Sequence, residues 1–436
     1  MKRILTALVL MFVALPAVAE IDIQEFTTPG GIKVWLVEEH SLPFTALELR
    51  FRGGASLDAP GKRGAINLMT GLIEEGAGDL DARAYSEARE TLATSIGFDV
   101  DDDALSVSAR FLSENRDQAV ELIRVALNDP LFTEDAIERV RGQVISGLKS
   151  RANDPNEIAA DAFAAAAFGD HPYGSYLGGT LESVASLTRQ DMLDAFAATV
   201  ARDRVYVSAV GDVDAQTLGG IVDTILGGLP ETGAPMPEHV DFAAPAGVQV
   251  IDYDTPQSVA RFGHIGIAID DPDFFAAYLI NTVFGGSGFN SRLMDEVREK
   301  RGLTYGIGSY LLAPDYAESV LGAVSSQNDR MAETIEVVRA EWAKLAQDGV
   351  SAEELEKAKL YLTGAYPLRF DGNATIARIL VGMQMSGYSV DYPKTRNERV
   401  NAVTLEEANR VARELYKPEA LSFVVVGRPV GVVSTE

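Results

Sequence analysis

The chain repeats itself once, and the length of the repeat limits the folds that it can adopt. Three segments of the first half match segments of the second half in chain order: 31–34 with 247–250, 133–138 with 351–356, and 207–211 with 423–427. The offset is 216 residues for the outer matches and 218 for the middle one. A period this long corresponds to a whole domain and not to the short unit of a solenoid. The sequence therefore predicts two similar domains.

A proline-rich segment separates the two halves. Residues 230–246 contain four prolines, at positions 230, 235, 237 and 245, and show no apolar period. Such a composition is typical of a linker. We therefore predict an N-terminal domain over residues 20–229 and a C-terminal domain over residues 247–436, which agrees with the 436-residue length of the chain.

Each half mixes the two hydrophobic periods. Apolar and polar residues alternate over 105–111, as in a half-buried strand, and apolar residues recur at helical spacing over 119–127. Ser351 and Glu354 form a capping box that predicts a helix of about 15 residues, and Thr133 caps its counterpart. Because strands and helices are grouped without regular alternation, we predict an α+β fold with one sheet and one helical layer in each half.

The composition excludes several classes of function. Hydrophobic residues make up 47% and charged residues 23% of the chain, as in an ordinary globular protein. The absence of cysteine excludes thiol nucleophiles, disulfides, iron–sulfur clusters and cysteine zinc sites. The 38 basic and 64 acidic residues give a net charge of −26, which repels phosphate backbones and anionic headgroups. We therefore expect no nucleic-acid partner.

The first residues have the pattern of a secretory signal. Basic residues at positions 2 and 3 precede an apolar run over Ile4–Leu15, and Ala17-Val18-Ala19 has the small-x-small pattern of a cleavage site. The alternative is a membrane anchor, but crossing a bilayer needs about 20 apolar residues. We therefore predict a signal peptide over residues 1–19, and a protein that is periplasmic or otherwise exported and does not insert into the membrane after cleavage.

The segment Arg63–Leu72 resembles a helix of the pitrilysin-type zinc metallopeptidases, the family of the insulin-degrading and mitochondrial processing peptidases. That helix carries the inverted motif His-x-x-Glu-His. Residues four apart share a helix face, so its two histidines bind one zinc ion while the glutamate activates the metal-bound water. The matching residues here are Asn67, Thr70 and Gly71. Asparagine is a poor zinc ligand, threonine is no base near neutral pH, and glycine has no side chain.

The third metal ligand of the family, a glutamate on a later helix, is also replaced. By the resemblance its position falls at about Gly147, and residues 144–148 contain no carboxylate. The four histidines of the chain, at positions 40, 171, 239 and 264, have no partner three or four residues away. We therefore expect no cofactor in this chain, and the resemblance implies that zinc belongs to a partner subunit.

The second half retains another part of the resemblance. Residues 281–305 carry a glycine-rich loop followed by SRL, VRE and RGLTY, which closely resembles the C-terminal signature of the family. The resemblance implies that Arg298 and Tyr305 reach the peptide carbonyl near the scissile bond in the chamber of a partner. It also implies a substrate-binding loop at Gly285, Gly286, Ser287 and Gly288, where glycine permits positive φ and close backbone approach.

The chemistry of these residue types suits that role. Arginine offers a fork of charged donors and tyrosine an uncharged one, so together they can position a carbonyl and stabilise an oxyanion. The alternative interpretation is structural. It pairs Arg298 with Glu296 or Glu299 and packs Tyr305 at the start of a strand over residues 305–312.

Further matches extend the resemblance over nearly the whole mature chain. They are His171-Pro172-Tyr173, residues 368–373 and residues 399–404. We interpret all three as structural. His171 precedes a proline and shapes a loop, while Asn401 and Thr404 have the chemistry of a turn and a helix cap.

The resemblance implies that the two domains form half of a clam-shell chamber. Loss of the metal ligands with retention of Arg298 and Tyr305 is the pattern expected of a non-catalytic subunit that pairs with a zinc-bearing homologue in a heterodimeric peptidase. A second hypothesis is a peptide-binding or scaffold protein without a hydrolytic role, and a third is a hydrolase with an unrecognised site. The sequence leaves open which peptide is bound, and whether the partner is another protein or a second copy of this chain.

Overall fold

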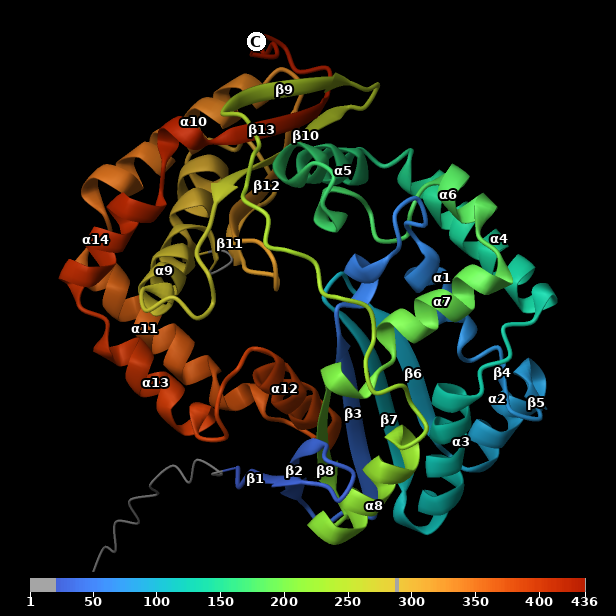
Figure 1. The fold of residues 1–436 in the computed structure, drawn as a ribbon. Helices are drawn as coiled ribbons and strands as arrows, with labels where there is room; N and C mark the ends of the chain where they lie inside the picture. The colour runs from blue at the N-terminus through green and yellow to red at the C-terminus, as the bar shows by residue number, and fades with distance from the viewer. Residues whose placement is uncertain (1–20, 287–289, 436) are drawn as a thin grey trace, which may run out of the picture.

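The structure is a computed structural model that describes residues 21–286 and 290–435. The expected signal peptide, and Ser287 and Gly288 of the expected binding loop, lie outside the described residues. Two sheet-and-helix halves face each other, with the first half in blue to green and the second in yellow to red (Figure 1).

The first half is built on a six-stranded sheet in the order β1-β2-β8-β3-β7-β6. Its strands are β1 (Gln24–Thr27), β2 (Lys33–Glu38), β3 (Phe44–Arg52), β6 (Ser95–Val100), β7 (Ala104–Leu112) and β8 (Val205–Gly211). All neighbours pair antiparallel except β2 and β8, which are parallel. Strand β7 confirms the strand predicted over residues 105–111. A short hairpin, β4 (Gly76–Ala77) with β5 (Leu80–Asp81), lies outside this sheet.

Helices cover the first sheet and enclose its core. They are α1 (Ala65–Leu72), α2 (Ala82–Thr91), α3 (Arg116–Asn128), α4 (Glu134–Arg151), α6 (Leu181–Ser186), α7 (Arg189–Thr199) and α8 (Ala215–Leu226). Buried apolar side chains of α1, α3, α4, α7 and α8 form one cluster with those of the strands. Helix α3 confirms the helical spacing over residues 119–127.

The second half has a five-stranded sheet in the order β11-β12-β10-β13-β9. Its strands are β9 (Gly247–Asp252), β10 (Gln257–Ile265), β11 (Ile307–Leu312), β12 (Ser319–Gln327) and β13 (Ser422–Gly427). Its helices are α9 (Phe274–Asn281), α10 (Met331–Asp348), α11 (Ala352–Ala365), α13 (Tyr392–Ala402) and α14 (Leu405–Leu415). Here too one pair alone, β9 with β13, is parallel.

The two sheets have the same topology. Strands β2, β8, β3, β7 and β6 correspond in order to β9, β13, β10, β12 and β11, and the parallel pair holds the same place in both sheets. The predicted α+β fold with two similar domains is therefore confirmed. Residues 230–246 belong to no helix or strand. The predicted domain boundaries stay predictions.

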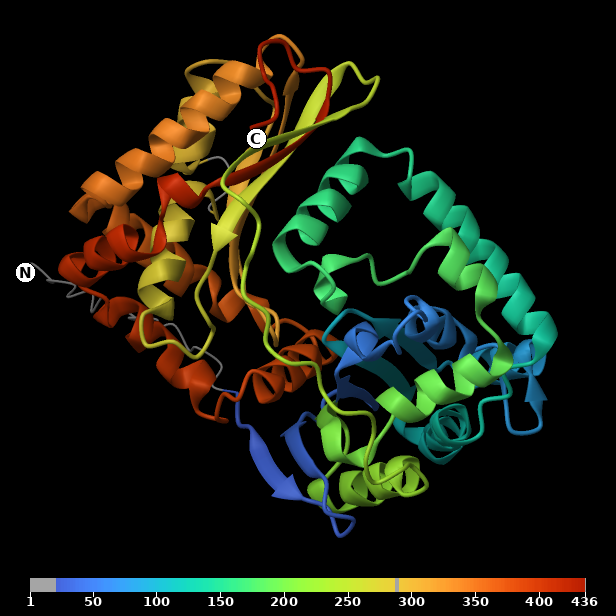
Figure 2. The same cartoon turned by 45° about the horizontal axis from the view of Figure 1, so that its top comes forward.

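One helix of each half packs on the sheet of the other half. Helix α5 (Pro155–Phe168) of the first half packs on β10 and β13, whereas α12 (Asn373–Met385) of the second half packs on β3 and β8 (Figure 1, Figure 2). Polar contacts fix α12, since the Ser208 hydroxyl donates to the Ala377 carbonyl at 2.6 Å and the Gln384 amide donates to the Val207 carbonyl at 2.7 Å. These crossed helices bind the two halves together.

Several predicted local features are present. Thr133 caps α4 through its hydroxyl, and Ser351 with Glu354 forms the capping box of α11, which has 14 residues. Thr404 caps α14 in the same way, and the His171 ring accepts from the backbone N–H of Tyr173. Among the described residues, no helix combines the length and apolar character that crossing a bilayer requires.

Candidate functional site

Helix α1 carries three of the degenerate metal positions, and a buried carboxylate fixes its start. Gly64 precedes the helix with φ of +95°. Asp58 accepts hydrogen bonds of 2.8 Å from the backbone N–H groups of both Gly64 and Ile66. Burial raises the pKa of Asp58 to about 6, against the opposing effect of these hydrogen bonds and of Arg63. These hydrogen bonds thus fix the start of α1, although the helix carries no metal-ligating side chain at the expected positions.

The residues at the positions of the family's zinc site lie on α1 and α4, two helices that pack against each other. They are Asn67, Thr70, Gly71 and Gly147. The Thr70 hydroxyl is buried and donates to the Ile66 carbonyl at 2.8 Å, while Asn67 is half-buried. A Cβ atom added to Gly71 would lie 3.3 Å from a methyl group of Val140, whereas one added to Gly147 would meet nothing within 4 Å. Over residues 21–286 and 290–435, the structure contains no group of three or more His, Asp or Glu side chains that could hold a metal ion.

The glycine-rich segment packs tightly on the second sheet. Helix α9 continues into a π-helix over Thr282–Gly286. A Cβ atom on Gly285 would approach the Ser309 hydroxyl oxygen to 2.3 Å, and one on Gly286 would approach the Asn281 amide nitrogen to 2.9 Å. Neither glycine has a positive φ. Of the two reasons for glycine, positive φ and close approach, only close approach applies to these residues: Gly285 packs against Ser309 of β11, and Gly286 packs against Asn281 of α9.

The segment that bears Arg298 and Tyr305 is anchored to β12. A second π-helix, Met294–Glu299, carries Arg298, and the chain then reverses at Gly302, whose φ is +61°. The Thr304 hydroxyl donates to the Ser325 carbonyl, and the Ser326 hydroxyl donates to the Leu303 carbonyl, both at 2.6 Å. These bonds fix residues 303 and 304, and Tyr305 projects from them with 87% of its surface exposed.

Arg298 and Tyr305 line one pocket of about 380 Å³. Its other lining residues are Gln257, Glu299, Gly302, Leu303, Thr304, Ser325, Ser326, Gln327 and Arg330. The Arg298 guanidinium is 2.6 Å from a Glu299 carboxylate oxygen, as the structural interpretation expected. The other part of that interpretation is wrong, because Tyr305 is exposed and β11 begins only at Ile307.

Ion pairs hold other parts of the C-terminal signature, residues 281–305, in place. Arg292 makes two hydrogen bonds of 2.6 Å to Glu354, at the start of α11. Burial alone would raise the pKa of Glu354, but the hydrogen bonds from Arg292 and Ser351 lower it to about 2. Glu296 pairs with Lys300 at 2.7 Å and with Arg301 at 2.6 Å. The segment that bears Arg298 and Tyr305 is therefore held in place, and both side chains can donate hydrogen bonds in the pocket.

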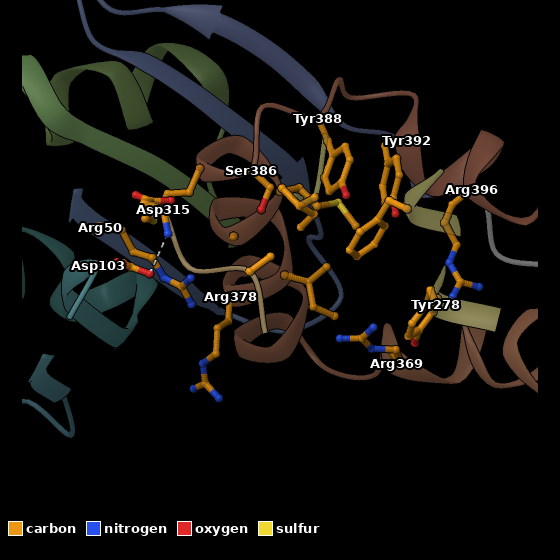
Figure 3. A pocket seen from close by; sticks show the side chains of 18 of the residues that line it. Arg50, Asp103, Tyr278, Asp315, Arg369, Arg378, Ser386, Tyr388, Tyr392 and Arg396 are labelled. Atoms are coloured by element: carbon orange, nitrogen blue, oxygen red, sulfur yellow. Dashed lines mark hydrogen bonds between the residues drawn. The ribbon is translucent and has the colours of Figure 1, made fainter. Parts of the chain in front are cut away.

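A second pocket, of about 590 Å³, was missed by the sequence analysis. It lies between the two halves, and Arg50 of β3, Arg369 of the turn after α11 and Arg378 of α12 line it (Figure 3). Arg369 lies in the matched segment 368–373, which we interpreted as structural. Arg50 and Arg378 gave no local signal, because only the packing of α12 on the first sheet brings them together.

Two protein-family models match consecutive segments of the chain. The model described as insulinase, peptidase family M16, matches residues 33–181, and the model described as peptidase M16 inactive domain matches residues 186–362. Among curated proteins, the non-peptidase homolog YmxG of Helicobacter pylori is 25% identical over 429 residues, which are 98% of both chains. The uncharacterized zinc protease YmxG of Bacillus subtilis is 24% identical over 92% of this chain and 98% of its own.

Solved structures support the same grouping. A peptidase M16 inactive domain from Pseudomonas fluorescens superposes with a TM-score of 0.89 at 26% identity and covers 95% of this chain and 100% of that one. A protease from H. pylori shares the fold with a TM-score of 0.83 at 18% identity, covering 93% and 99% of the two chains. The chain therefore belongs to the peptidase M16 family, as a homologue of the non-peptidase kind.

Proposed function

We propose that this chain is the non-catalytic subunit of a heterodimeric zinc metallopeptidase, in which it positions peptides for hydrolysis at the zinc of its partner. One observation carries the proposal: Tyr305 is 87% exposed and shares a pocket with Arg298. Tyrosine and arginine are both enriched at the core of protein interfaces, where the ring supplies apolar area and the hydroxyl and guanidinium groups supply hydrogen bonds. The pair therefore suits a surface that a partner would cover.

The degenerate metal positions support the same role. The described residues offer no metal site, so hydrolysis by zinc requires ligands from another chain. Arg298 and Tyr305 would donate hydrogen bonds to the peptide carbonyl oxygen as it gains charge, which is the usual way of stabilising a tetrahedral intermediate. The relative in H. pylori is itself named a non-peptidase homologue.

The experiment is co-expression with an M16 homologue that carries an intact His-x-x-Glu-His motif, taken from the same genome. We expect a stable heterodimer in gel filtration, with a kcat/KM for a quenched-fluorescence peptide far above that of either chain alone. Separate elution at micromolar concentration, without added activity on mixing, would contradict the proposal and favour the scaffold hypothesis. Gel filtration of this chain by itself reports whether a second copy serves as the partner.

We also propose that the protein acts in the periplasm. The basic, apolar and small-residue pattern of residues 1–19 supports export. Osmotic shock should release the protein with Glu20 as its first residue, as read by N-terminal sequencing. Retention in the spheroplast fraction with Met1 intact would contradict export.

A further inference from the structure

The pocket between the halves presents three arginines whose guanidinium groups have no hydrogen-bond partner among the described residues. Arg50, Arg369 and Arg378 make no side-chain hydrogen bond or ion pair within the described part of the chain. Buried Glu48 attracts Arg50 and Arg378 electrostatically, but its hydrogen-bond donor is the Ser108 hydroxyl at 2.8 Å. These guanidiniums are therefore open to an acceptor from outside the chain.

The carboxylates that line the same pocket already have donors. Asp101 accepts from the backbone N–H groups of Asp103 and Ala104, and Asp103 accepts from the Tyr173 hydroxyl and from the Asp315 N–H. Asp315 pairs with Arg52 at 3.4 Å. Among the described residues, each of these carboxylates thus already has a donor or a cation beside it, whereas the guanidinium groups of Arg50, Arg369 and Arg378 have no hydrogen-bonded acceptor, so these donors match an anion.

Two buried atoms point to the same chemistry. The Arg50 Nε atom and the Tyr366 hydroxyl are buried and have no hydrogen-bond partner in the described part of the chain. Burial raises the pKa of Tyr366 to about 12, so its hydroxyl keeps its proton and remains a donor. A buried donor without an acceptor is costly, and both residues line the pocket.

The remaining wall of the pocket is aromatic. Tyr388 and Tyr392 stack with ring centroids 3.9 Å apart, and Tyr278 stands beside Arg396 farther along the same side (Figure 3). Arg396 lies over the rings of Tyr278 and Tyr366 and donates to the Leu362 carbonyl, so it belongs to this wall and not to the open arginines. Aromatic faces of this kind bind apolar and aromatic side chains.

We infer that this pocket binds an acidic peptide segment, with its carboxylates on Arg50, Arg369 and Arg378 and a neighbouring aromatic side chain against the tyrosines. Charged donors to carboxylates are among the strongest hydrogen bonds in proteins, and arginine matches the geometry of a carboxylate. The segment contributes acceptors for these three guanidinium groups, and an apolar surface that the aromatic wall can cover.

The inference deepens the proposed function, and rests on it only in naming these acidic peptides as substrates of the complex. The binding itself needs no partner and no zinc. A test on the isolated chain therefore separates the two proposals: acidic peptides that bind while the heterodimer fails to form would refute the function and leave the pocket assignment standing.

Isothermal titration calorimetry of the isolated full chain provides the test. The probe is the capped peptide acetyl-Phe-Glu-Asp-Phe-amide, its uncharged counterpart is acetyl-Phe-Gln-Asn-Phe-amide, and inorganic phosphate tests for a free anion. We expect the acidic peptide to bind at least about tenfold more tightly than the uncharged one, and Arg369→Gln and Arg378→Gln each to weaken it about tenfold. Both side chains are exposed, so these variants should fold.

The matched control is Arg413→Gln, which removes one exposed positive charge from α14, away from the pocket. It should bind the acidic peptide as the wild type does, and Arg378→Lys should recover part of the affinity lost in Arg378→Gln. Equal binding of the two peptides, or unchanged binding in both pocket variants, would overturn the inference. Binding of phosphate without binding of the acidic peptide would also overturn it, since the pocket would then serve a free anion.

Discussion

Asp103 accepts a hydrogen bond of 3.2 Å from the backbone N–H of Asp315, and this bond joins the tips of two equivalent hairpins. Asp103 lies in the turn between β6 and β7, and Asp315 lies in the turn between β11 and β12. The same carboxylate accepts from the Tyr173 hydroxyl, and that hydroxyl accepts in turn from the Tyr316 N–H at 3.2 Å. A point of the first domain and its counterpart in the second domain thus meet in one partly buried polar network.

This network predicts how stability depends on pH. Burial raises the pKa of Asp103 to about 6, whereas in the unfolded chain it is 3.8. Between these values the folded state binds the proton more tightly, so the contribution of Asp103 to stability falls as pH rises from 4 to 6. Urea unfolding at several pH values should show a weaker fall in Asp103→Asn than in the wild type. Identical pH profiles would contradict the burial of this charge.

Glu354 predicts the opposite slope in a more acidic range. Its pKa is about 2 in the folded chain against 4.5 as a free group, so its pairing with Arg292 stabilises the fold above pH 4.5 and is lost as pH falls toward 2. In Arg292→Met we expect much of this acid-induced loss to disappear, because the pair no longer exists at any pH. A wild-type acid profile in that variant would show that the pair contributes nothing.

Arg298 and Tyr305 should matter to turnover and little to folding. In the heterodimer, Arg298→Ala and Tyr305→Phe should each lower kcat/KM by about 10²-fold while the zinc content of the partner is unchanged. Since Tyr305 is 87% exposed, Tyr305→Phe should leave the Tm of the isolated chain where it is.

The control for Tyr305→Phe is Tyr361→Phe, which alters an exposed tyrosine outside the pocket. It should retain full activity. Full activity in both Arg298→Ala and Tyr305→Phe, with the dimer intact, would mean that the functional site lies elsewhere and that the glycine-rich segment is architectural.

The two glycines at former ligand positions should respond differently to alanine. Gly147 lies in α4 with open space around it, so Gly147→Ala should stabilise the chain by about 0.5–1 kcal/mol through helix propensity. Gly71→Ala should gain less, because its new methyl group meets Val140 at 3.3 Å. Thermal unfolding of the two variants checks the order, and an equal gain in both would contradict it.

The isolated chain should also bind no stoichiometric zinc. Asn67, Gly71 and Gly147 supply no ligand of the kind that holds a catalytic zinc ion. Elemental analysis of untagged protein, purified without a chelator, should give far less than one zinc per chain. About one zinc per chain would require a site that neither the sequence nor the described residues reveal.

Local patterns in the sequence predicted much of the fold. The alternation over residues 105–111 and the caps at Thr133 and Thr404 depend on neighbours in the chain. The repeat near 216 residues becomes visible when one half of the sequence is laid over the other. Each of these features appears in the structure. The packing of α5 and α12 on the opposite sheets has no comparable pattern in the sequence. It depends on contacts such as that of Gln384 with Val207, which lie 177 residues apart, and no repeat in the sequence has that spacing.

The candidate site was predictable only in part, for a similar reason. The resemblance brought Arg298 and Tyr305 together, and the structure places both in one pocket. The sequence could not tell positive φ from close approach at Gly285, because both favour glycine. It also could not bring Arg50 and Arg378 to one place, because they lie 328 positions apart and meet only where α12 crosses the first sheet.

The exchanged helices determine where a chamber built from this chain can open. Each half buries part of the sheet of the other, so parting the halves would strip α5 from β10 and β13 and α12 from β3 and β8 at once. Such a separation would leave the two large cores intact but expose the apolar clusters that span both contacts, which is costly. If the chain works in an assembly, we therefore expect its two halves to move as one rigid body and a peptide to enter between this chain and its partner.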